Sequence, residues 1–574
     1  MKKLINQVAA VVPEMLSGLV GLNPGLALLA GGSIVIRADA TEQASLGRVA
    51  LISGGGSGHE PAHGGYVGPG MLSAAVAGEI FTSPSTDSVL DAIRAVAGPG
   101  GVLLIVKNYT GDRLNFSLAA EIARSEGLEV ELVVVADDVA LSADGPHAGR
   151  RGLAGTVLVH KVAGAAAAEG RPLAEVAEAA RSAAAALGTM GVALGACTVP
   201  AAGEPGFVLA DDEIEWGLGI HGEPGVRRTA MEPADAIVEH LLGPIIDDLG
   251  LGAGSRVALL VNNLGGSAAG ELNLVAGSAV RYLTTRQLTV ERAWAGTFLS
   301  ALEMPGCSLS LLEVDDARLE WLDAPTRTTA WPEHLGRLPA ARVPVEVAGA
   351  VDESGIDPAN GSLSPSSALR RALEAVCATL VDAESELTRL DQQVGDGDLG
   401  DSLARAARAM SAELDSYPAE SDPGAVLRRI SATVRRVVGG TSGPLYAVML
   451  VRAAVELERP DRTPAEAWAA AFTSAVAGVR DLGGASLGDR TMVDALDPAA
   501  HALAGALAAS ADPVAALTAA VEAAEAGTEH TASLTARLGR SSYVGDRAVG
   551  VPDPGARAVS LWLAAVRDSL SVRD

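Results

Sequence analysis

The chain has 574 residues, more than one hydrophobic core usually organises, so we expect about two to four domains. Its 43 basic and 70 acidic side chains give a formal net charge of −27, which argues against nucleic acid or an anionic membrane as a partner. Hydrophobic residues make up 48% and aromatic residues only 3%, a balance typical of a soluble globular protein.

The cysteines are typical of a reducing compartment, and the N-terminus does not fit a signal peptide well. The cysteines are few and far apart, with neither a disulfide framework nor a zinc spacing: Cys197, Cys307 and Cys377. The first residues resemble the start of a signal peptide, but Pro13 and Glu14 interrupt the apolar run. We find no long uninterrupted apolar window and therefore expect a cytoplasmic protein without a transmembrane helix.

The lysines exclude two common nucleotide sites. They occur only at four positions: Lys2, Lys3, Lys107 and Lys161. No Gly-Lys pair exists, so a Walker A loop is impossible, and neither H-R-D nor D-F-G of protein kinases is present. If the chain handles ATP, then metal, arginine and backbone N–H groups must neutralise the phosphates.

From residue 1 to about 335, short β-branched runs alternate with Gly-rich loops and Ala-rich helical stretches. This alternation predicts an α/β architecture, in which ligands bind beyond the carboxyl ends of the strands. The candidate strands are Val49–Ser53, Val102–Val106, Val130–Ala136 and Arg256–Asn262.

The first candidate loop is Gly54-Gly-Gly-Ser57-Gly-His59-Glu60-Pro61, directly after a predicted strand. Its glycines allow a tight turn that presents N–H groups, and His59 adds one titratable imidazole. The pattern is not that of a dinucleotide-binding loop, and a purely structural glycine turn is an alternative.

Two further loops carry polar groups. Lys107-Asn-Tyr-Thr-Gly-Asp112 follows a predicted strand and suits a small polyhydroxylated ligand, the alternative being a surface Lys–Asp loop. In Glu215-Trp-Gly-Leu-Gly-Ile-His221-Gly-Glu-Pro-Gly, glycines flank a lone histidine and favour its exposure over burial in a core.

In order and spacing, these three segments resemble the substrate-binding domain of the dihydroxyacetone kinase family. The resemblance implies that His221 holds a ketose covalently as a hemiaminal, and that His59 and Asp112 act at the hydroxyl to be phosphorylated, with Asp112 as general base. It also implies substrate contacts at the remaining matched positions: Gly56, Ser57, Gly58 and Lys107. The chemistry is reasonable, because a neutral imidazole can add reversibly to a ketone and glycerol offers no carbonyl.

Residues 340–365 are rich in turn formers and predict a linker between a domain at 1–339 and another at 366–574. If unstructured, its 26 residues would span about 25–30 Å. Beyond it strand signals vanish, and Ala-rich runs predict an all-α bundle. The predicted helices are 367–386, 402–414, 424–437, 444–457, 464–478, 491–508, 513–526 and 555–570.

The loop Asp391-Gln-Gln-Val-Gly-Asp396-Gly-Asp398-Leu-Gly-Asp401 contains clustered carboxylates that would repel one another unless a cation binds between them. Hard ions such as Mg²⁺ prefer these oxygen ligands, and the glycines let backbone approach a ligand closely. The spacing misses the EF-hand pattern, and a solvated acidic turn is the alternative. We interpret the loop as a Mg²⁺–nucleotide site.

This half resembles the nucleotide-binding domain of the same family. The resemblance implies Mg²⁺ ligands at Asp391, Asp396 and Asp398. It implies nucleotide contacts at Leu399, Gly400, Asp401, Ser402, Thr441, Ser442, Gly483, Met492, Arg540, Asp553, Pro554 and Gly555. The family often has His or Thr at position 399, so Leu leaves only backbone groups to serve there.

We therefore predict an ATP-dependent kinase, most simply converting dihydroxyacetone to dihydroxyacetone phosphate in glycerol metabolism, with Mg²⁺ and ATP and as a homodimer. Phosphoenolpyruvate-dependent members of the family resemble separate chains with a phosphocarrier, which favours ATP here. The alternatives are an erythrulose kinase, an enzyme that cyclises FAD with the same nucleotide domain, and a non-catalytic module that binds carbonyl compounds or fatty acids.

Overall fold

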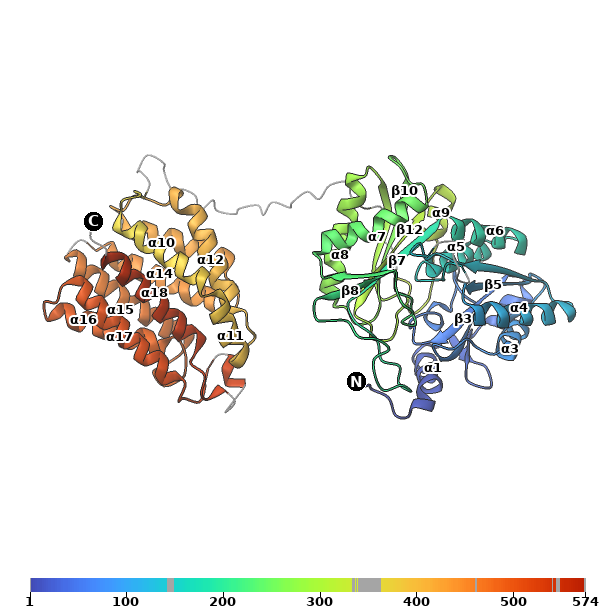
Figure 1. Cartoon of the computed structure of the whole chain (residues 1–574), viewed down its shortest axis with the longest axis horizontal. Coiled ribbons are helices and arrows are strands. Elements are labelled where there is room, and N and C mark those ends of the chain that lie inside the picture. Colours follow the sequence, from blue (N-terminus) through green and yellow to red (C-terminus); the bar gives the residue numbers. More distant parts are fainter. Residues whose placement is uncertain are drawn as a thin grey trace. The chain divides into compact units, whose positions relative to one another are not determined.

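The computed structural model divides the chain into two compact units, Met1–Pro344 and Val345–Asp574 (Figure 1). It describes residues 2–141, 149–332, 336, 338, 363–459, 462–538, 540–543 and 548–571. The predicted linker lies almost entirely outside the described residues, so its conformation stays a prediction.

The first unit contains two six-stranded sheets, in agreement with an α/β domain of two subdomains. The first sheet has the order β1-β2-β4-β3-β5-β6, with parallel pairing from β4 to β6 and antiparallel pairing at β1 and β2. Its strands are β1 Leu26–Leu28, β2 Ile34–Arg37, β3 Ala50–Ser57, β4 Ala74–Ile80, β5 Val102–Lys107 and β6 Val130–Val135.

Helices cover both faces of this sheet, because successive side chains of β5 point to opposite sides. Leu103 and Ile105 join a core that includes residues of α1, α5 and α6, whereas Leu104 and Val106 pack with α3 and α4. The helices are α1 Val11–Leu22, α2 Ala40–Ser45, α3 Thr86–Val96, α4 Thr110–Ser125, α5 Thr156–Ala168 and α6 Leu173–Ala185, with short 3₁₀ turns at Val8–Ala10 and Gly64–Tyr66.

The second sheet has the order β11-β10-β12-β7-β8-β9. Its inner face joins the core of the first sheet, since Leu51 and Leu103 belong to the same hydrophobic cluster as Leu260 and Leu312. The other face packs on α7 and α8. The elements are β7 Leu187–Ala193, β8 Glu213–Trp216, β9 Arg227–Ala230, α7 Ala234–Asp248, β10 Arg256–Asn263, α8 Ala269–Thr285, β11 Thr289–Gly296, β12 Gly306–Glu313 and α9 Asp316–Asp323.

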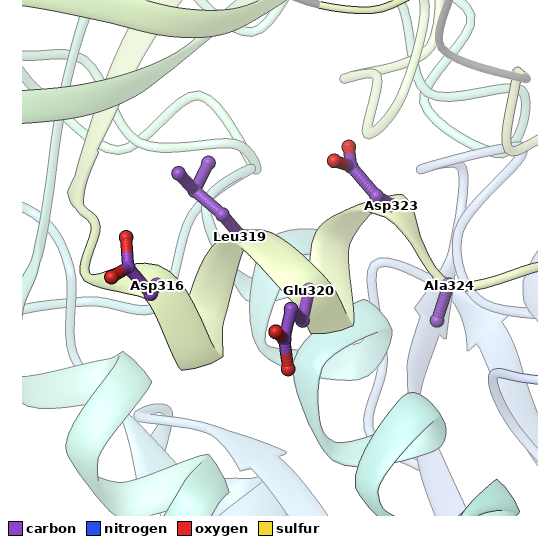
Figure 2. A pocket seen from close by; sticks show the side chains of 5 residues that line it. All are labelled: Asp316, Leu319, Glu320, Asp323 and Ala324. Carbon is purple, nitrogen blue, oxygen red and sulfur yellow. The ribbon is translucent and has the colours of Figure 1, made fainter.

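Helix α9 carries a shallow acidic hollow of about 440 Å³ on its surface (Figure 2). Its walls are Asp316, Leu319, Glu320, Asp323 and Ala324. Beneath the helix, the Lys161 ammonium donates to the carbonyls of Trp321 and Ala324, at 2.5 and 2.8 Å. Burial lowers the pKa of Lys161 to about 8, and this lysine serves to close the carboxyl end of α9.

The second unit is all-α among its described residues, as predicted. Side chains start several helices, for example Asp422 at α13 and a reciprocal Thr463–Glu466 pair at α15. The helices are α10 Ala368–Asp382, α11 Glu384–Val394, α12 Leu399–Glu413, α13 Pro423–Val437, α14 Ser442–Leu457, α15 Pro464–Gly483, α16 Val493–Ala508, α17 Pro513–Thr531 and α18 Pro554–Ser571, with 3₁₀ turns at Leu414–Ser416 and Arg540–Tyr543.

Several helix and strand boundaries differ from the prediction, and two of the differences affect the candidate sites. The predicted helix 367–386 is two helices, and α11 continues to Val394, so Asp391 lies in a helix and not in a loop. Strand β3 continues to Ser57, so the glycine run is part of the strand. No helix within the described parts of the chain is long and apolar enough to cross a membrane.

Candidate functional site

The first site lies where β3 and β5 end, as the strand–loop pattern predicts. The β3 glycines allow the backbone to pack closely: a methyl group at Gly54 would lie 2.3 Å from the Val76 carbonyl oxygen, and one at Gly56 would lie 2.6 Å from the Thr82 nitrogen. The chain then turns at Gly58, with φ of +98°, and this turn delivers His59.

Three rings surround the His221 imidazole. Ring centroids of His59, Tyr109 and Phe81 lie 4.8, 4.7 and 5.1 Å from it, each in an edge-on arrangement. His221 itself is about one-fifth exposed, so one side of the ring is open to a ligand. The predicted histidines are thus brought together from segments far apart in the sequence.

Glu223 fixes the orientation of His221. Its carboxylate accepts the His221 backbone N–H at 2.9 Å and lies 2.8 Å from His221 Nδ1. Burial alone would raise the pKa of Glu223, but the hydrogen bonds and charge of His221 outweigh it and lower that pKa to about 2. Because an ionised carboxylate only accepts, Nδ1 carries the hydrogen, and Nε2 is the nitrogen that holds the lone pair whenever the ring is neutral.

His59 is a neutral acceptor. Its side chain is fully buried, and Nδ1 lies 2.8 Å from the Ser300 carbonyl, which places the hydrogen on Nδ1. Nε2 has no hydrogen-bond partner among the described residues. Burial, then the charges of Lys107 and His221, hold the pKa of His59 well below its ordinary value.

Lys107 and Asp112 complete the polar wall. A methyl group at Gly55 would lie 3.4 Å from Lys107 Nζ and 3.5 Å from Asp112 Oδ2, so both charges flank β3. Asp112 is 3% exposed in the first turn of α4, and the Ser83 hydroxyl donates to its Oδ1 at 2.5 Å. Burial lowers the pKa of Lys107, opposed first by the charge of Asp112.

Ser57, a predicted substrate contact, also has a structural partner. Its hydroxyl donates to the Gly78 carbonyl at 2.7 Å and so ties β3 to β4. Sequence reasoning missed Glu223, Tyr109 and Ser83. Glu223 could have been found, because it stands two residues after His221 within the same glycine-rich motif.

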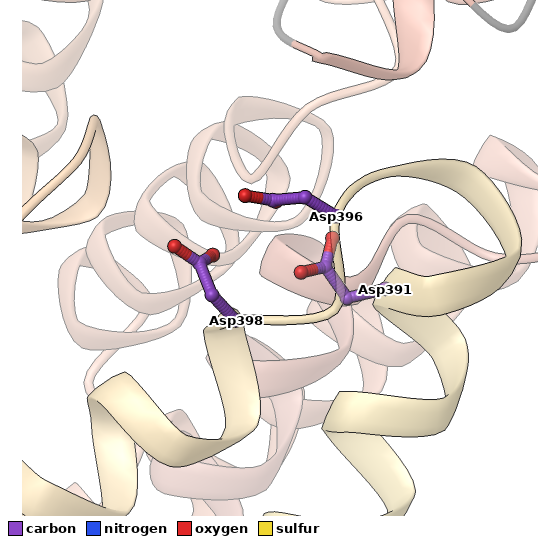
Figure 3. A group of neighbouring side chains, drawn as sticks. All are labelled: Asp391, Asp396 and Asp398. Atoms are coloured by element: carbon purple, nitrogen blue, oxygen red, sulfur yellow. The ribbon is translucent and has the colours of Figure 1, made fainter. Parts of the chain in front are cut away.

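The second site is a group of three carboxylates (Figure 3). One oxygen from each of Asp391, Asp396 and Asp398 lies within 4.8 Å of the others, and Figure 3 shows the side chains converging. Asp391 is buried near the end of α11, and Asp398 is the residue directly before α12, without a capping side-chain hydrogen bond. A methyl group at Gly395 would lie 2.5 Å from Asp391 Oδ1, so glycine is needed for this approach. The donor set suits Mg²⁺.

The residues after this cluster pack α12 on α11. Leu399 donates its N–H to Asp391 at 3.2 Å, and its side chain is buried in a small core with Leu387 and Leu403. A methyl group at Gly400 would lie 2.2 Å from Thr388 Oγ1. Leu399 and Gly400 therefore act in helix packing. Asp401 forms an exposed ion pair with Arg405 at 2.5 Å, and Ser402 is buried.

The other predicted nucleotide contacts mark helix ends. Thr441 directly precedes α14 without a capping side-chain hydrogen bond, Ser442 is the first residue of α14, and Gly483 is the last residue of α15. Arg540 begins a 3₁₀ turn, and its side chain lies outside the described part of the structure.

The start of α18 meets the start of α16. A methyl group at Gly555 would lie 3.4 Å from Met492 Cβ. Pro554 is the first residue of α18, and Asp553 accepts the Ala556 N–H at 2.8 Å. Burial, and then the charges of Asp494 and Asp391, raise the pKa of Asp553 to about 6. The charge of Asp391 is one of these influences, so Asp553 and the carboxylate cluster interact electrostatically.

Comparison with known proteins covers both units. Residues 17–330 match the family described as Dak1 domain, and residues 393–568 match DAK2 domain. A putative 3,4-dihydroxy-2-butanone kinase of Solanum lycopersicum is 46% identical, over 100% of this chain and 98% of that protein. The triokinase/FMN cyclase of Homo sapiens is 45% identical over 99% of each.

A D-erythrulose kinase of Mycolicibacterium smegmatis is 36% identical over 100% of this chain and 99% of that protein. Among solved structures, the dihydroxyacetone kinase from C. freundii in complex with AMP-PNP and Mg²⁺ is similar with a TM-score of 0.60. It is 36% identical, and 99% of each chain is covered.

Proposed function

Since the chain belongs to the dihydroxyacetone kinase family, with both its Dak1 and DAK2 domains, we propose that it transfers a phosphoryl group from ATP to a small ketose, dihydroxyacetone first. The observation that carries this proposal is the contact of 2.8 Å between His221 Nδ1 and Glu223, which leaves Nε2 as the nitrogen available to a ligand. A ring held in this way is a nucleophile for a carbonyl and has little use in a purely structural role.

In the proposed binding step, the His221 Nε2 lone pair forms a bond to the ketose carbonyl carbon. The electron pair of the C=O bond moves to the oxygen, which takes a proton from water. The ring becomes positively charged, and the Glu223 carboxylate at Nδ1 balances that charge. A triose has few atoms with which to gain affinity, so a reversible covalent bond is an effective way to hold it and to reject glycerol.

In the transfer step, Asp112 takes the proton of the terminal hydroxyl, and Ser83 holds its carboxylate in place at 2.5 Å. The unpartnered His59 Nε2 accepts a hydrogen bond from the same ketose. The Lys107 ammonium beside Asp112 stabilises negative charge on the substrate. The backbone of Gly56 and Gly58 lines the pocket, and Ser57 holds that backbone through Gly78.

In the second unit, the carboxylates of Asp391, Asp396 and Asp398 would hold Mg²⁺, and the ion would supply positive charge to the transferring phosphoryl group. The nucleotide lies against the helix starts described above. The N–H groups at Thr441 and Ser442 and the guanidinium of Arg540 contact phosphates. The remaining contacts are Leu399, Gly400, Asp401, Ser402, Gly483, Met492, Asp553, Pro554 and Gly555, of which Leu399 and Gly400 serve chiefly by placing α12.

The human relative is named a triokinase and an FMN cyclase, which supports flavin-nucleotide cyclisation as a second candidate activity. We place the protein in the cytoplasm, in glycerol metabolism and as a homodimer. The experiment that separates the activities is an assay of ADP release with dihydroxyacetone, glyceraldehyde, both erythruloses and glycerol, alongside cyclic product formation from FAD. ADP release with ketoses and none with glycerol is expected. Equal release without any acceptor contradicts the kinase proposal.

A further inference from the structure

We infer that Arg151, together with Asp138, is a positioning residue for His221 and acts through Glu223. Neither Arg151 nor Asp138 lies in the motifs discussed above. The inference rests on the proposed function, because it concerns how the proposed ketose-binding histidine is held. It predicts that ketose capture depends on a guanidinium that does not itself touch the ketose.

Arg151 is a buried cation with fixed partners on two edges. It is 8% exposed, Nε donates to Asp138 Oδ2 at 2.6 Å, and Nη2 donates to the Gly217 carbonyl at 2.7 Å. Asp138 is fully buried, and its other oxygen accepts the Ala140 N–H at 3.0 Å. A guanidinium bound at both Nε and Nη2 has one orientation, so Nη1 is aimed in a fixed direction.

That direction is toward Glu223. A methyl group at Gly219 would lie 2.6 Å from Arg151 Nη1 and 2.0 Å from Glu223 Oε2. The guanidinium and the carboxylate therefore approach each other through the space that the absent side chain of Gly219 leaves. Arg151 thus holds the backbone before His221, at Gly217, and faces the carboxylate that follows it.

The electrostatic consequence follows from the two contacts of Glu223 with His221. A half-buried carboxylate such as Glu223, with no cation beside it, attracts a second proton to a neighbouring imidazole, and an imidazolium has no lone pair with which to attack a carbonyl. Arg151 faces Glu223 without pairing with it directly and shares its charge with Asp138, so it adds to the positive field that lets Glu223 accept Nδ1–H from a neutral ring.

Several other ionisable groups surround His221, and they come from different elements. They are His59 after β3, Lys107 at the end of β5, Tyr109 before α4, Glu223 on the same loop, and the Asp138–Arg151 pair. Within this set, Lys107 and Arg151 are the cations near Glu223, and Arg151 is the one that faces its Oε2 across Gly219. Its removal therefore acts mainly on the contact that fixes the tautomer.

The test compares Arg151→Gln with Arg150→Gln in the full-length protein. Arg150 is the adjacent arginine, but its guanidinium pairs with Asp248 at 2.7 Å, away from His221, and it is a matched control. Dihydroxyacetone labelled with ¹³C at the carbonyl reports the adduct by NMR, because the bound carbon becomes tetrahedral. Steady-state kinetics as a function of pH give KM and kcat separately.

For Arg151→Gln we expect the adduct signal to fall and the ketose KM to rise by at least about tenfold, with kcat changed by less than about threefold. The acidic limb of the kcat/KM profile should move up by about one pH unit. Arg150→Gln should match the wild type. If Arg151→Gln only reduced the fraction of correctly folded enzyme, the apparent kcat would fall while KM and the acidic limb of the pH profile stayed unchanged. That result would overturn the inference.

A second variant covers the case in which Arg151→Gln does not fold. Arg151→Lys keeps the positive charge but lacks the forked guanidinium that binds both Asp138 and the Gly217 carbonyl. A raised ketose KM supports the inference, and an unchanged KM overturns it. If the wild type gives no tetrahedral carbon signal, the proposed tether itself fails. If it gives the signal and Arg151→Gln gives it equally, only the role of Arg151 is refuted.

Discussion

Asp112→Asn isolates the proposed base. The 2.5 Å hydrogen bond from Ser83 to Oδ1 can persist with an amide oxygen, and the shape of the side chain is unchanged. General-base removal usually costs about two to four orders of magnitude in rate. The charge of Asp112 is also the main influence that opposes the lowering of the Lys107 pKa by burial. Asp112→Asn should therefore lower the pKa of Lys107 further and make its charged form less stable.

Loss of the base and the effect on Lys107 together place the expected loss of kcat near the upper end of that range, at about 10³–10⁴-fold. This corresponds to roughly 4–5.5 kcal/mol of transition-state stabilisation. The assay is coupled ADP release at saturating ketose and ATP, with adduct formation followed by ¹³C NMR. The adduct should persist, because Asp112 does not contact His221. The matched control is Asp87→Asn, an exposed aspartate in the first turn of α3, which should keep full activity. A loss in Asp112→Asn of less than tenfold would show that another group takes the proton, and His59 would then be the candidate.

His221→Ala should abolish the ¹³C adduct and weaken ketose binding while ATP binding, measured by calorimetry, is retained; unchanged ketose affinity would contradict the covalent tether. Asp396→Ala should abolish Mg²⁺-dependent turnover. It should also abolish the rise in melting temperature that Mg²⁺–ATP gives the wild type. An equal rise in the variant would mean that the carboxylate cluster is a solvated acidic turn. Burial lowers the pKa of His160 from 6.5 to about 3. Between these two pH values the unfolded chain binds a proton at His160 that the folded chain does not. The free energy of unfolding therefore falls as pH falls from 6.5 toward 3, by up to about 1.4 kcal/mol per pH unit. His160→Phe should flatten this pH dependence of the unfolding free energy, measured by urea unfolding of the first unit with ketose bound. An unchanged slope of unfolding free energy against pH would show that His160 is not the group responsible.

The local pattern of the sequence determined the class of each half and most helix positions. β-branched runs followed by Gly-rich loops predict an α/β unit with ligand groups at strand ends, and His59, Lys107 and Asp112 do lie at the ends of β3 and β5 or just after them. Ala-rich runs predict an all-α unit, because helix propensity and periodicity are local properties. The spacing of Asp391, Asp396 and Asp398 was enough to predict a carboxylate cluster.

Tertiary packing decided the remaining features. Periodicity could not place the boundary between α10 and α11, because no glycine or proline separates them, and it therefore left Asp391 in a loop. The β3 glycines are strand residues because the β4 backbone lies against them, and Ser57 is engaged with Gly78 for the same reason. The approach of Arg151 to Glu223 joins residues 72 positions apart through the space at Gly219. Such contacts depend on how distant segments pack, and no local pattern of residues encodes them.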